Sequence, residues 1–127
     1  MTPEVPAVLA QLAQVAARNA APGVPDAERA SDLAITAMLL TLAAEVWDGA
    51  AARLVEENRA LRALLGQAGG DDDLRLSALT AENHGLRAKL IEAHIAAEQS
   101  DDAARQDLIW AELLASTERR KLSVSLV

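Results

Sequence analysis

The chain has 127 residues, is half apolar, carries a formal net charge of −7 and contains no cysteine. The acidic balance excludes the basic patch that nucleic-acid binding requires, so we expect no nucleic-acid partner. The lack of cysteine excludes disulfides, thiol catalysis and thiolate metal sites. By size the chain is a single domain, residues 1–127, and its Ala-rich composition without strand-like segments predicts an all-α fold.

The first predicted element is a short helix over residues 1–20. Thr2-Pro3-Glu4 supplies a hydroxyl N-cap, a proline at the first helical position and an acid in the first turn. This N-terminus has no basic region ahead of its apolar residues, so we expect no signal peptide. Residues 21–25, rich in proline and glycine, predict a linker.

A long helix is predicted over residues 26–66, with Asp26 as its cap. Its most apolar stretch, residues 33–47, is fifteen residues long, whereas a membrane span needs about 20. We therefore expect no membrane contact and a cytoplasmic location. The excess of Arg over Lys and the many Ala residues hint at a GC-rich bacterial genome.

A turn over residues 67–71 and a second long helix over residues 72–121 complete the prediction, followed by a tail at 122–127. Asp71, Asp72 and Asp73 are expected to cap this helix, because carboxylates suit the positive end of the helix dipole. Gln99-Ser100-Asp101-Asp102 resembles another capped start. A kink or split near residue 100 is therefore the alternative to one continuous helix.

Both long helices carry apolar residues in a seven-residue pattern, which is typical of coiled-coil packing. If the two long helices fold back on each other at the turn, they form a long antiparallel coiled-coil-like helical hairpin. The predicted fold is therefore a short N-terminal helix plus this hairpin. The hairpin is expected to form a helical bundle at one end, where residues 108–115 would face residues 33–47.

The segment EENRALRALL at 56–65 resembles AENHGLRAKL at 81–90, and both contain Glu-Asn-x-x-Leu-Arg. We name them the first and second repeat segments. In the hairpin, Asn58 and Asn83 fall in one layer, where each amide can satisfy the other. We interpret the two Asn as register-setting residues. The alternative is that both amides are merely tolerated near a solvated surface.

The 33–47 stretch carries a second apolar stripe and is apolar almost all round, so it must be buried on several sides. We expect part of this surface to form a homodimer interface, with coverage by the short N-terminal helix alone as the alternative. The candidate interface residues are Ile35, Leu39, Leu42, Val46, Trp47, Ile109, Trp110 and Leu113.

No catalytic or cofactor-binding constellation is visible, so we expect no enzyme activity and no cofactor. Glu92, His94 and Glu98 could offer a metal two or three ligands, but a solvated charged face explains them more simply, and we predict no metal site. The sequence favours a non-catalytic structural or adaptor protein that acts through a helix-mediated dimer interface. The alternative is a ligand-binding or accessory subunit of a larger complex, with a pocket near Trp47 and Trp110.

Overall fold

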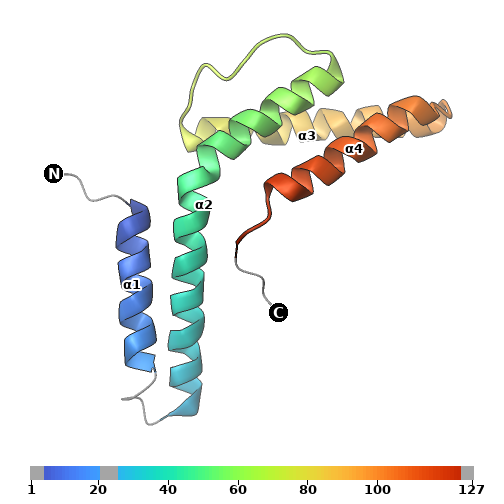
Figure 1. Cartoon of the computed structure of the whole chain (residues 1–127). Coiled ribbons are helices and arrows are strands. Elements are labelled where there is room, and N and C mark those ends of the chain that lie inside the picture. Colours follow the sequence, from blue (N-terminus) through green and yellow to red (C-terminus); the bar gives the residue numbers. More distant parts are fainter. Residues whose placement is uncertain (1–4, 21–25, 124–127) are drawn as a thin grey trace. The chain divides into compact units, whose positions relative to one another are not determined.

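The computed structural model describes residues 5–20 and 26–123, and these form four helices with no strand among them (Figure 1). The helices are α1 (Val5–Ala20), α2 (Ala27–Leu65), α3 (Leu76–Gln99) and α4 (Ala103–Arg119). The all-α prediction is confirmed. The expected helix start at 2–4, the linker at 21–25 and the last tail residues, 124–127, lie outside the described residues.

The helices group into two compact units, where the sequence predicted one domain. The first unit comprises residues 1–49 and 122–127, and the second comprises residues 50–121. Helix α2 contributes its first part to the first unit and its remainder to the second. Each unit is described separately below.

In the first unit, α1 lies beside the first part of α2 (Figure 1). Asp26 caps α2 as expected, because its side chain accepts a 2.9 Å hydrogen bond from the Glu28 backbone N–H. The residues buried on the two helices are small, Ala13 on α1 and Ala37 on α2, and small side chains allow close helix approach. Ser123 donates its backbone N–H (2.6 Å) and hydroxyl (2.7 Å) to the Glu45 carboxylate.

The core of the second unit is built by the end of α2, by α3 and by α4. It is a leucine-rich cluster comprising Leu61, Leu86, Leu90 and Ile109, against which Leu64, Leu65 and Leu113 pack. The expectation that residues 108–115 face residues 33–47 is wrong for Ile109, which is 0% exposed within this cluster. The break before α4 is the reason, because it lets α4 pack against α3.

The single helix expected over residues 72–121 is two helices, so the split near residue 100 is what the structure has. Asp101 adopts the left-handed φ of 54°, a conformation that Asp tolerates better than most residues. The Asp102 side chain then accepts a 3.0 Å hydrogen bond from the Arg105 backbone N–H and caps α4. Local capping therefore ends one helix and starts another without glycine or proline.

The predicted start of the second long helix also needs correction, because α3 begins at Leu76 and its N-cap, Arg75, makes no side-chain capping hydrogen bond. Asp73 instead accepts a 3.0 Å bond from the Arg75 backbone N–H. Asp71 is partly buried, and its side chain, 5% exposed, bonds to Arg62 at 2.8 Å. This ion pair engages the Asp71 carboxylate away from the end of α3. The connection between α2 and α3 therefore runs over residues 66–75.

Candidate functional site

The two repeat segments contact each other in the second unit through matching side chains. The Arg87 Nη2 donates to the Glu57 Oε1 at 2.6 Å, and the Arg62 Nη2 donates to the Glu82 Oε1 at 2.9 Å. The glutamate of each segment thus pairs with the arginine of the other. Because both segments have the same residue spacing, the two ion pairs are reciprocal, as they are in a two-fold symmetric contact, although both segments belong to one chain.

Asn58 and Asn83 lie between these ion pairs, and both are buried. The Asn83 Nδ2 donates to the Asn58 Oδ1 at 3.0 Å. The Asn58 Nδ2 donates to the Asp71 Oδ1 at 3.1 Å and to the Leu79 carbonyl at 3.3 Å. The Asn58 amide therefore uses both donors and its acceptor, as a buried amide requires. The two amides meet, and their role in setting register stays a prediction.

Glu57 is the carboxylate that joins the three helices of this unit, and it is only 2% exposed. It pairs with Arg87 from α3 and with the Arg120 Nη2 (2.8 Å) at the end of α4, and it accepts a 3.2 Å bond from the Ser116 hydroxyl. Burial acts to raise the pKa of Glu57. The hydrogen bonds and charges of Arg120 and Arg87 together outweigh burial, so the pKa lies below its usual value.

Sequence reasoning missed the contribution of α4 to this cluster. Ser116 and Arg120 are four residues apart and so share one face of α4. That face also carries Ile109 and Leu113, which pack into the core. The available signal was that Ser116 and Arg120 continue the apolar stripe of Ile109 and Leu113. The expectation of one continuous helix instead placed residues 108–115 opposite residues 33–47.

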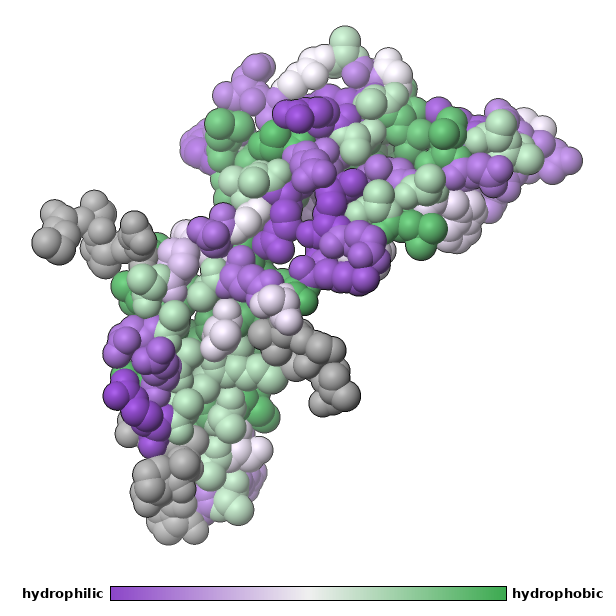
Figure 2. All heavy atoms as spheres, in the orientation of Figure 1, coloured by the Kyte–Doolittle hydropathy of each residue, from purple (hydrophilic) through white to green (hydrophobic). Residues whose placement is uncertain are grey.

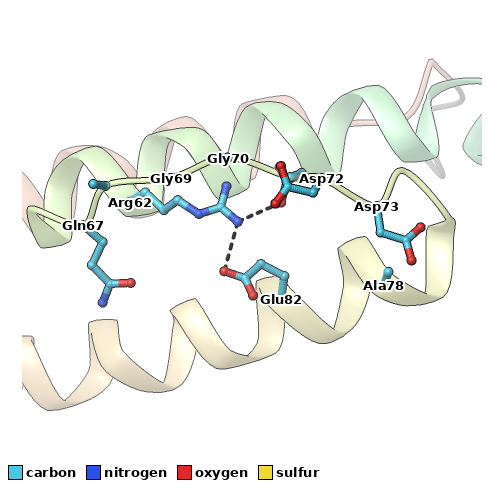
Figure 3. Close-up of a pocket in the computed structure, with 10 residues that line it drawn as sticks. Arg62, Gln67, Gly69, Gly70, Asp72, Asp73, Ala78 and Glu82 are labelled. Carbon is cyan, nitrogen blue, oxygen red and sulfur yellow. Dashed lines mark hydrogen bonds and ion pairs between the residues drawn. The ribbon is translucent and has the colours of Figure 1, made fainter.

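A cavity of about 350 Å³ opens beside Arg62, under the 66–75 connection (Figure 3). Its lining residues are Arg62, Gln67, Ala68, Gly69, Gly70, Asp71, Asp72, Asp73, Ala78 and Glu82. Arg62 already binds two carboxylates, those of Asp71 and Glu82, and its hydrogen bond lowers the pKa of Asp71. These two carboxylates neutralise the Arg62 guanidinium, so Arg62 offers an incoming anion no uncompensated positive charge.

Glu92, His94 and Glu98, the candidate metal ligands of the sequence, all lie on α3. Among the residues that the structure describes, no group of three His, Cys, Asp or Glu side chains could hold a metal ion. The His94 ring instead meets Trp110 edge-on, with ring centroids 5.6 Å apart, and its Nε2 lies 3.7 Å from the Glu98 Oε1. His94 thus packs between α3 and α4.

The predicted interface residues divide between the two units. Ile35, Leu39, Leu42, Val46 and Trp47 belong to α2 in the first unit; Leu39 (56%) and Trp47 (54%) are the most exposed, and Leu42 is partly buried. Ile109, Trp110 and Leu113 belong to α4 in the second unit, where Ile109 is fully buried and Leu113 packs on the core. Ile109 is therefore part of the core of the second unit, and the assignment of these residues to an interface stays a prediction.

The first unit also exposes an apolar stripe on α1 that was not predicted as an interface. It comprises Val5, Val8, Leu12 and Val15, at helical spacing. The contact face of α1 uses other positions, including Ala13. Apolar residues therefore cover much of the visible surface of this unit (Figure 2).

By length and composition alone, α2 also passes the test for a membrane span. An 18-residue window within it has a mean hydropathy of 1.4, and 6% of that window is buried. The apolar stretch over residues 33–47, fifteen residues long, is shorter than this window. Helices at the core of soluble proteins and signal sequences pass the same test.

Comparison of the chain with protein-family models, with curated proteins and with solved structures finds no match.

Proposed function

We propose that the protein is a non-catalytic helical interaction protein that forms a homodimer through its first unit. The observation that carries this proposal is the exposed apolar surface on α1 and α2 (Figure 2). Its members are Val5, Val8, Leu12, Val15, Ile35, Met38, Leu39, Val46 and Trp47. A single chain leaves them in water, and a partner would bury them.

The size of this surface supports a specific contact. Together these side chains expose on the order of 700 Å², divided between α1 and α2. Each partner in a stable complex contributes about 800 Å². A second copy is the simplest partner, because two-fold dimers are the commonest soluble oligomers.

We propose that the second unit supports this interface as a self-contained antiparallel coiled-coil hairpin, closed by α4. Its cross-helix pairs support the arrangement, since Glu57 bonds to Arg87 while the later Arg62 bonds to the earlier Glu82. The buried ionisable groups in this unit are engaged in ion pairs. This supports a structural role for them, in keeping with a non-catalytic protein in the cytoplasm.

The test is the molar mass of the whole chain by light scattering over a concentration series. We expect about twice the 13.4 kDa chain mass at high micromolar concentration. Leu39→Glu should shift the protein toward monomer, because a carboxylate in a buried interface costs several kcal/mol. Leu114→Glu is the matched control: Leu114 is 68% exposed, but on the second unit. A wild-type chain that stays monomeric up to millimolar concentration would contradict the proposal.

A further inference from the structure

The exposed stripe on the first part of α2 has the spacing of a coiled-coil seam. Ile35, Leu39, Leu42 and Val46 follow one another at intervals of four, three and four residues, which is the a/d pattern of a heptad. At 100° per residue, these positions lie opposite the more buried residues of the same helix. Those residues are Leu33, Ala37, Leu40 and Ala44. We name Ile35, Leu39, Leu42 and Val46 the outer seam; Leu42 is partly buried and the other three are exposed.

The positions beside the outer seam are suited to close helix contact. Thr36, Met38 and Ala43 flank it and carry no charge; the fourth flanking residue is Glu45, whose carboxylate accepts hydrogen bonds from Ser123. Interface cores are depleted of charged residues, and small flanking side chains allow helices to approach. Trp47 lies about 100° away around the helix and is outside the seam.

The ends of the outer seam distinguish between the two possible helix directions. Continuing the heptad places Asp32 at the position before Ile35 and Gly49 at the position after Val46. A parallel pair would set each Asp32 carboxylate against its own copy, which is unfavourable in a seam. An antiparallel pair sets Asp32 beside Gly49 of the second copy, and it also aligns the helix dipoles favourably.

From this pattern we infer that the outer seam pairs antiparallel with the outer seam of a second copy. Ile35 of one copy then meets Val46 of the other, and Leu39 meets Leu42. This inference rests on the proposed function and adds to it the face and the direction of pairing. The two-fold axis passes near the middle of the seam, so the contact is isologous.

The area of the seam sets the expected strength. Its side chains and Met38 expose on the order of 400 Å² per copy, so the pair removes roughly 800 Å², below the 1,200–2,000 Å² of stable complexes. The dimer should therefore depend on concentration in the micromolar range. A membrane fits this face less well, because the chain carries a net charge of −7 and anionic lipid surfaces attract basic segments.

The absence of cysteine makes disulfide trapping a direct test in the full chain. Ile35→Cys and Val46→Cys are prepared separately, then oxidised alone and mixed. In the antiparallel pair, two copies of residue 35 lie about 16 Å apart along the axis, beyond disulfide reach of roughly 7 Å. Residue 35 of one copy and residue 46 of the other meet in one layer. We expect the mixed disulfide, identified by mass spectrometry, to exceed either homodisulfide at least tenfold.

Leu114→Cys mixed with Ile35→Cys is the control for random collision and should give no enrichment. Efficient homodisulfides from each single variant would overturn the inference in favour of a parallel pair. A dimeric mass without enrichment of the mixed disulfide would overturn the inference and leave the proposed function standing. A monomeric mass would overturn both. Cosedimentation of the monomer with zwitterionic or anionic vesicles would assign the seam to a membrane and overturn the inference.

Discussion

Replacing Asn58 or Asn83 with leucine tests whether the paired amides act as one unit. Asn58→Leu removes three hydrogen bonds, those with Asn83, Asp71 and the Leu79 carbonyl. Asn83→Leu removes the donor to the Asn58 Oδ1. A buried polar group left without a partner costs about 1–3 kcal/mol, partly offset by the added apolar area. We therefore expect Asn58→Leu to cost about 2–4 kcal/mol and Asn83→Leu about 1–2 kcal/mol.

The double variant decides whether the two effects are coupled. When both amides are absent, neither leaves the other unpaired, so the double variant should be more stable than the sum of the single effects predicts, by about 1 kcal/mol. It should not regain wild-type stability. Asp71 and the Leu79 carbonyl still lose their bonds to Asn58, although Asp71 keeps Arg62.

The assay is urea denaturation followed by circular dichroism, with the molar mass of each variant measured at the same concentration. The mass measurement is needed because dimerisation would add to the apparent stability. Single effects that add within about 0.3 kcal/mol would refute the reasoning, because a direct bond between the amides requires coupling. A change in mass in the double variant would indicate that the amides restrict which helices pair.

Two further predictions concern the second unit. Because the folded-state pKa of Glu57 lies below its ordinary value, the ionised carboxylate stabilises the fold above that value, and this stabilisation is lost as the pH falls through the folded pKa. Glu57→Gln should cost about 2 kcal/mol near pH 7 and flatten the acid limb of a stability–pH curve; an unchanged acid limb would show that other carboxylates control it. Gly66→Ala should destabilise by about 1 kcal/mol, since Gly66 has a φ of 67° after α2, whereas Gly85→Ala, in the interior of α3 with open space around its Cα, should stabilise by up to about 1 kcal/mol. Equal effects of the two alanines in thermal melts would contradict this backbone argument.

The sequence by itself determined the helical class and the bounds of α2. Ala and Leu dominance without strand-like runs left no other class, and the Asp26 cap located the start of α2 to within a residue. The heptad pattern predicted the contact between Asn58 and Asn83, because a fixed residue spacing on two helices limits which layers of side chains can meet. Both inferences depend on local periodicity and capping, which a sequence displays directly.

The tertiary structure decided where α4 packs. Gln99-Ser100-Asp101-Asp102 carried a capping signal, but the signal could not say whether the chain reverses there. That outcome depends on the left-handed Asp101 and on the free energy gained when Ile109 joins Leu61, Leu86 and Leu90. The free energy of packing arises from contacts between residues that are distant in sequence, so a local sequence pattern does not predict it.

The same limit applies to the charged residues. Glu57 and Arg62 lie next to the seam residues Asn58 and Leu61, at flanking positions where a heptad pattern expects charged pairs at the rim, yet both are buried. Their partners Arg120 and Asp71 come from a helix end and a connection whose positions are fixed only by the fold. A buried charge is tolerable only where oppositely charged groups surround it, and those groups are assembled by tertiary packing.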